Sequence, residues 1–112
     1  MLFRSWNYTS YIYTAAPLAN PPVMTSPTSG SVLPGSSVTF QWTPGTGVTM
    51  YQLAVGTYGP GYYNTYVSPN LTTTSITVPN IPTNGKPVYV TLRYLVDGKA
   101  WQTAYYTYTA AP

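Results

Sequence analysis

Apolar and polar residues alternate along several short stretches of the chain, with the period of two that a β-strand gives to its side chains. Residues 37–42 (SVTFQW) show the pattern most clearly, and it recurs in residues 49–56, 73–78 and 88–96. The apolar positions of these stretches are the predicted core: Val38, Phe40, Trp42, Tyr51, Leu53, Val55, Ile76, Val78, Val88, Val90 and Leu92. No stretch has the period of 3.6 that marks an amphipathic helix, so the pattern predicts an all-β fold.

Glycine, proline and aspartate separate these stretches at the intervals expected of short strands joined by turns. Asp97-Gly98 predicts a two-residue hairpin turn of type I′ before a last strand at residues 99–109. Shorter strands are expected at residues 23–26 and 62–67. About seven strands with turn signals every 8–12 residues favour a Greek-key β-sandwich.

A twelve-residue stretch occurs twice in the chain. Residues 6–17 (WNYTSYIYTAAP) and residues 101–112 (WQTAYYTYTAAP) are identical at seven of their twelve positions without a gap. Trp6 and Trp101 are 95 residues apart, which is about the length of one small β-sandwich domain. A repeat at this period is typical of a modular array.

The repeat divides the chain into three parts. Residues 1–17 are predicted to be an extra N-terminal strand arm, similar to the last strand of a preceding module. Residues 18–22 form a proline-rich linker, which is stiff and cannot continue a helix. Residues 23–112 form the sandwich domain.

The sequence resembles a known class of domains over residues 22–112. The block PVMTSPTSGSVLPGSSVTFQW followed by YQLAVGT is similar to the immunoglobulin-like, fibronectin-type-III-like domains of bacterial secreted and surface proteins. VYVTLRYLVDGKAW and YTYTAAP resemble the last hairpin of those domains. The resemblance implies that Trp42 is the core tryptophan of the sandwich and that the protein is extracellular or on the cell surface. It implies no particular function, because such sandwiches host many.

The composition favours association over free diffusion. Charged residues make up only 4% of the chain and aromatic residues 16%, with thirteen tyrosines. Typical globular proteins have about 25% charged residues. A surface with so little charge repulsion favours contacts between copies of the chain.

The same composition excludes several classes of function. The chain has no His, Cys or Glu and a single Asp, so it lacks the pair of titratable groups that acid–base catalysis needs, and an enzyme is not expected. The residues that bind metals are missing too, and no cofactor is expected. Four scattered cations do not form the basic face that nucleic acid requires. The chain has no run of about 18 apolar residues, so membrane insertion is not expected.

Tyrosines gather around one predicted loop and the strand after it: Tyr58, Tyr62, Tyr63 and Tyr66. Exposed aromatic rings can stack on sugars, so this group is a candidate glycan-binding patch. The alternative is that half of these side chains pack inward and the others form ordinary strand surface or contacts between subunits.

Three functions remain open for the protein, and the repeated strand serves the first two directly. The preferred one is a filament subunit, in which the arm adds to or exchanges with a strand of a neighbouring copy, anchored by large side chains: Trp6, Tyr8, Tyr11, Ile12 and Tyr13. The second is one repeat of a tandem immunoglobulin-like adhesin or carbohydrate-binding module, whose partners are neighbouring repeats. The third is a decoration or tail protein on a virion surface. The chain's own copy at residues 101–112 competes with the arm for the last-strand position.

Overall fold

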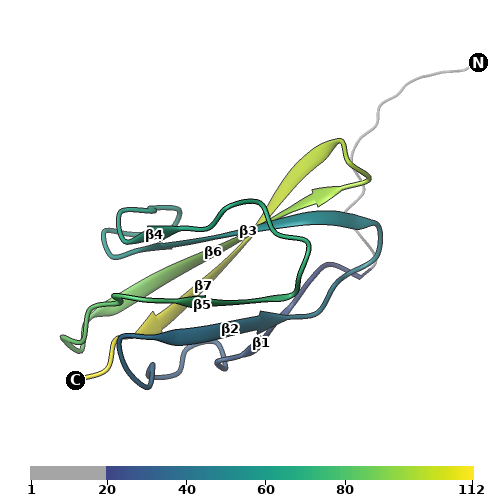
Figure 1. The fold of residues 1–112 in the computed structure, drawn as a ribbon. Helices are drawn as coiled ribbons and strands as arrows, with labels where there is room; N and C mark the ends of the chain where they lie inside the picture. Colours follow the sequence, from purple (N-terminus) through teal and green to yellow (C-terminus); the bar gives the residue numbers. More distant parts are fainter. Residues whose placement is uncertain (1–19) are drawn as a thin grey trace, which may run out of the picture.

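The computed structural model describes residues 20–112, which comprise the predicted sandwich domain and the end of the linker (Figure 1). The predicted N-terminal arm lies outside the described residues. Its anchoring side chains, Trp6, Tyr8, Tyr11, Ile12 and Tyr13, therefore stay predictions.

The described residues form two antiparallel sheets that pack face to face (Figure 1). The three-stranded sheet has the order β1-β2-β5, and the four-stranded sheet has the order β4-β3-β6-β7. The strands are β1 (Met24–Ser26), β2 (Val38–Trp42), β3 (Val48–Gly56), β4 (Tyr66–Val67), β5 (Ser75–Val78), β6 (Pro87–Val96) and β7 (Ala100–Thr109). The predicted all-β fold is confirmed. The described part of the chain contains no helix that could cross a membrane.

The core lies between the sheets and contains most of the residues that the alternating pattern predicts. Ten of the eleven predicted core side chains are buried. Ile76 is the exception: it is only half-buried and packs at the margin, because β5 is an edge strand. The predicted core did not include Met24 of β1, Leu33 of a loop, Tyr108 of β7 or Ala110 just after β7, all of which are buried.

Two local predictions have opposite outcomes. The hairpin turn is confirmed: Asp97 and Gly98 both have positive φ, and the Lys99 N–H donates to the Val96 carbonyl over 2.9 Å. The strand predicted at residues 62–67 is wrong, because only Tyr66–Val67 is a strand.

Side-chain hydrogen bonds explain why residues 62–65 form a loop. The Thr57 N–H donates to Asn64 Oδ1 over 3.0 Å, and Asn64 Nδ2 donates to Thr57 Oγ1 over 2.9 Å. The Asn64 side chain thus closes the β3–β4 loop across its base and satisfies a backbone donor. The loop, residues 57–65, is called the tyrosine loop below.

Candidate functional site

The repeated stretch, residues 101–112, comprises all of β7 except its first residue and continues to the end of the described chain. It fills the last-strand position of its own domain. Strand β7 pairs with β6 along its whole length, from Pro87↔Thr109 to Val96↔Ala100. Its side chains alternate: Tyr108 is buried between the sheets, whereas Thr107 faces solvent.

Three of the seven residues that the two copies share face the core: Tyr106 and Tyr108 of β7, and Ala110 just after it. Tyr108 is 1% exposed, its hydroxyl donates to the Pro27 carbonyl over 2.9 Å, and its ring meets Phe40 edge-on at 5.7 Å. Tyr106 packs against the core and accepts the Met24 N–H over 3.2 Å. Ala110 is buried as well. Tyr11, Tyr13 and Ala15 are the matching residues of the first copy.

Burial also changes the acidity of this tyrosine. Desolvation, with a smaller contribution from the neighbouring Tyr106, raises the pKa of Tyr108 to about 12 from its ordinary value of 10. Burial raises the pKa of Tyr51 in the same way.

The outer edge of β7 is covered over only part of its length. The Gly30 N–H donates to the Thr107 carbonyl, and the Leu33 N–H donates to the Thr109 carbonyl. Backbone groups of alternate residues point to the same edge of a strand, so those of Thr103 point outward as well. Within the described residues, nothing covers that part of the edge.

The tyrosine loop carries three of the four tyrosines that the sequence singled out. Tyr58, Tyr62 and Tyr63 are 75%, 52% and 68% exposed, and the rings of Tyr58 and Tyr62 meet edge-on at 5.6 Å. Tyr66 is not part of this group, because it packs against the core. The alternative expectation, that half of these four side chains pack inward, is met by Tyr66 alone.

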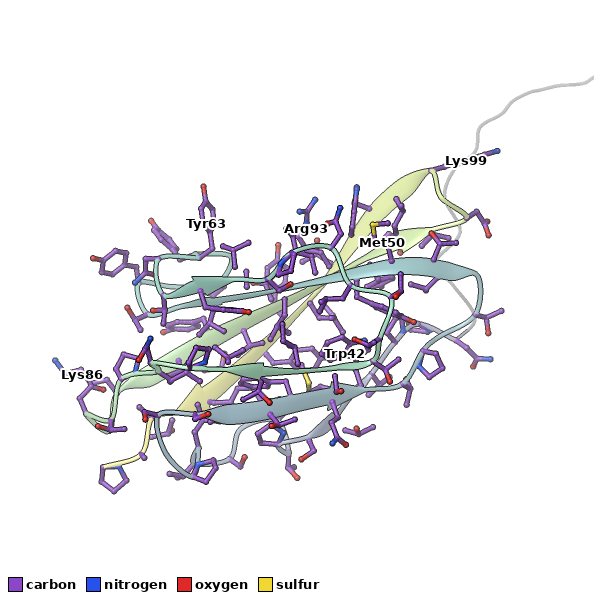
Figure 2. The ribbon with its side chains drawn as sticks, in the orientation of Figure 1. Trp42, Met50, Tyr63, Lys86, Arg93 and Lys99 are labelled. Atoms are coloured by element: carbon purple, nitrogen blue, oxygen red, sulfur yellow. The ribbon has the colours of Figure 1, made fainter. Side chains whose placement is uncertain are left out.

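Two adjoining hollows lie beside these tyrosines. The first, of about 470 Å³, is formed by residues 58 and 60–64 of the tyrosine loop. The second, of about 420 Å³, lies on the outer face of the four-stranded sheet, where Ala54 and Thr91 are part of its lining. Gly61 and Tyr63 line both hollows. Figure 2 shows Tyr63 and Arg93 on this outer side, with Trp42 between the sheets.

Polar side chains from β3 and β6 line the second hollow. Arg93 Nη1 donates to Gln52 Oε1 over 2.6 Å, and Gln52 Nε2 donates to the Ser68 carbonyl over 3.2 Å. The Arg93 guanidinium also lies 4.7 Å from the centre of the Trp101 ring, a cation–π contact that holds it over the sheet. Thr91 is only 5% exposed, and its hydroxyl has no partner among the described residues.

The backbone of the tyrosine loop lies so close to Gly56, at the end of β3, that a side chain at Gly56 would not fit. A Cβ at Gly56 would lie 2.3 Å from the Tyr62 carbonyl oxygen, which is backbone and cannot swing away. Gly56→Ala should therefore lower the free energy of unfolding by about 1–3 kcal/mol, measured by urea denaturation.

Gly35→Ala is the matched control, since a Cβ there has nothing within 4 Å and its φ is not positive. Its effect should stay within about 0.5 kcal/mol. Equal effects of the two substitutions would contradict the close approach of loop and sheet at Gly56.

The described residues contain no cluster of the side chains that commonly bind metal ions. No three residues of the types His, Cys, Asp and Glu come together in residues 20–112. Asp97, the only acidic residue of the chain, sits in the hairpin turn, where Asp-Gly serves the backbone conformation. What the site offers instead is an aromatic surface beside hydrogen-bonding groups.

The described chain begins and ends at opposite ends of the sandwich (Figure 1). The Thr46 N–H donates to the Asn20 carbonyl beside the start of β3, which pairs with the end of β6. The Gly85 N–H donates to the Ala111 carbonyl just before the start of β6. The ten residues of β6 span about 30 Å.

Gln52, Thr91, Arg93 and Tyr105 lie on the outer face of the sheet, and sequence reasoning did not single them out as a site. They alternate with the core residues of β3, β6 and β7, so the pattern could place them outward. The pattern gave no sign that the tyrosine loop folds back over them, and hence none that Thr91 is buried there.

Comparisons with known proteins support the fold alone. The chain matches no described protein family and no curated protein. It is similar to an engineered protein whose crystal structure, at 1.98 Å, comes from the Northeast Structural Genomics Consortium, with a TM-score of 0.58 and 19% identity. The match covers 95% of this chain and 22% of the engineered protein, so the chain spans under a quarter of that protein's length.

Proposed function

We propose that the chain carries one module of an extracellular or cell-surface protein built from tandem immunoglobulin-like, fibronectin-III-like Greek-key sandwiches. Its role is structural: modules follow one another head to tail, and residues 6–17 are the last strand of the preceding module. The single observation that carries the proposal is the match between the two copies at Tyr106, Tyr108 and Ala110, three inward residues at the end of β7 and just after it.

The identities near the end of the strand favour a folded strand over a chance repeat. From Tyr105 to Ala110 the copies agree at Tyr106, Tyr108 and Ala110, which face the core, and differ at Tyr105 and Thr107, which face solvent. Outside this pattern, they differ at the inward Ala104 and agree at the outward Trp101 and Thr109. A sequence that needs to fill the same place in a similar sandwich keeps its inward residues, whereas its outward residues are free to vary.

The strand order and the chain ends agree with this proposal. In immunoglobulin-like sandwiches the first, second and fifth strands share a sheet, and the third, sixth and seventh share the other. Here β1, β2 and β5 form one sheet, and β3, β6 and β7 belong to the other, which β4 joins beside β3 and not beside β5. Because the described chain starts at one end of the sandwich and leaves at the other, successive modules can line up without doubling back.

A fusion tests the proposal directly. In the fusion, residues 1–5 are replaced by a second copy of residues 20–100, and the rest of the chain follows from Trp6 onward. Residues 6–17 then stand directly after that copy, in the place that residues 101–112 have after residue 100 in the parent chain. We expect two folded sandwiches and twice the parent's change in far-ultraviolet circular dichroism per molecule on unfolding. Tyr13→Ala should unfold the first sandwich of the fusion and leave the parent chain's stability unchanged. A first sandwich that stays unfolded would contradict the proposal.

Strand addition between copies is the second candidate, favoured by the uncovered part of the β7 edge. A filament subunit could add its residues 6–17 beside Thr103 of a neighbour without displacing β7. Sedimentation of the full chain should then show oligomers that grow with concentration and disappear in Thr103→Pro, since proline is tolerated at an edge but cannot donate there. A chain that stays monomeric at high concentration excludes the filament and leaves the tandem module.

A further inference from the structure

We propose that the outer face of the four-stranded sheet, together with the tyrosine loop, binds two successive sugar residues of a polysaccharide. The inference goes beyond the structural role proposed above and rests on described residues alone. The parts of the site are an aromatic surface, an unpaired hydroxyl and a fixed guanidinium, which come from separate elements of the fold.

The aromatic surface is too exposed to serve the stability of the domain. Tyr58 and Tyr63 leave 75% and 68% of their surface in solvent, on a loop that the Asn64 side chain holds closed. Aromatic rings with a polar tip are suited to ligands that have both an apolar face and hydroxyl groups. A pyranose ring has this character, because its axial C–H groups form an apolar face inside a rim of hydroxyls.

The unpaired hydroxyl is the second, independent observation. Thr91 lies in the centre of the sheet, between Ala54 on β3 and Tyr105 on β7 in register, and it lines the second hollow. Its hydroxyl oxygen is buried without a hydrogen-bond partner among the described residues. Most buried polar side chains in folded proteins have a partner, so an orphaned hydroxyl in the wall of a hollow points to a ligand that supplies one.

Arg93 adds donors that the protein itself does not use up. One N–H goes to Gln52, and the face of the guanidinium is stacked on Trp101, which fixes its position. A guanidinium has five N–H donors, and no ion pair is formed in the described residues; the chain's only acid, Asp97, lies in the hairpin turn. The remaining donors suit sugar hydroxyls, and they suit the carboxylate of an acidic sugar still better.

The shape of the site favours a polymer over a free monosaccharide. The two hollows, of about 470 and 420 Å³, are both open to solvent and meet at Tyr63. We place one sugar ring against the tyrosines of the loop and the next sugar ring over Thr91. Tyr63 then lies between the two rings. An open site lets the polysaccharide continue in both directions beyond the two bound residues.

Affinity electrophoresis of the full chain tests the proposal, with gels that contain dextran, xylan or β-glucan as neutral probes and polygalacturonate or alginate as acidic ones. We expect at least one polysaccharide to retard the protein. Tyr63→Ala should weaken that binding about tenfold or more, as should Thr91→Val. Arg93→Gln should weaken an acidic probe more than a neutral one, which separates the two classes of sugar.

Two matched variants keep the test specific. Thr39→Val changes a threonine on the outer face of the other sheet, and Tyr89→Ala removes a tyrosine of β6 that lines neither hollow; both should bind like the parent. Thr91→Val should not lower the stability, because the hydroxyl it removes has no partner. Lack of retardation by every probe, or binding that Tyr63→Ala and Thr91→Val leave unchanged, would overturn the proposal.

Discussion

Tyr108→Ala should lower the free energy of unfolding by about 3–5 kcal/mol, the largest effect expected of a single substitution on β7. The ring is almost completely buried, packs edge-on against Phe40 and ties β7 to the Pro27 carbonyl. A domain of this size has a total stability of about 5–15 kcal/mol, so the variant loses roughly a fifth of it at the least and nearly all of it at the most. Urea denaturation, followed by tryptophan fluorescence to which the buried Trp42 contributes, measures the change.

Tyr105→Ala is the matched control, since Tyr105 lies on the same strand but faces outward and is 61% exposed. Its loss should change the stability by no more than about 0.5 kcal/mol. Similar losses in the two variants would mean that β7 does not turn Tyr108 toward the core. That result would also remove the basis for comparing the inward residues of the two repeated stretches.

The fold was predictable because its strands follow a simple rule. Val38, Phe40 and Trp42 alternate with polar residues, and burial of one sheet face requires that alternation. The Asp-Gly turn was predictable for a related reason: type I′ turns need two residues that accept positive φ, which few residue types do. Both signals are local, so they can be seen in a single sequence.

The candidate site was less predictable because it depends on contacts between distant segments. Tyr62 and Tyr63 are of a residue type that favours strands. They lie in a loop instead because the Asn64 side chain forms hydrogen bonds with Thr57, and because Gly56 has no Cβ to collide with the Tyr62 backbone. Thr91 has the outward position of an ordinary surface residue. Only the folded loop above it makes its hydroxyl a buried, unpaired group.

Alkaline pH should destabilise the domain through Tyr108. Its pKa is about 12 in the folded state and 10 as an ordinary tyrosine, so between these values the unfolded chain releases a proton that the folded chain keeps. Stability is therefore unaffected by this group below pH 10 and falls as the pH rises from 10 to 12. A difference of two pKa units corresponds to a loss of about 2–3 kcal/mol once the pH passes 12.

Tyr108→Phe separates this effect from the ionisation of the other tyrosines and the lysines. At pH 7 the variant should be less stable than the parent by about 1 kcal/mol, because the Pro27 carbonyl loses its hydrogen bond. Above pH 10 its stability should fall less steeply, so the two curves approach each other and then cross. Urea denaturation at pH 7, 9, 10, 11 and 12 measures both curves, with Tyr105→Phe as an exposed control that follows the parent. Parallel curves for Tyr108→Phe and the parent would show that Tyr108 ionises as easily in the folded domain as in the unfolded chain, which its burial against Phe40 should not allow.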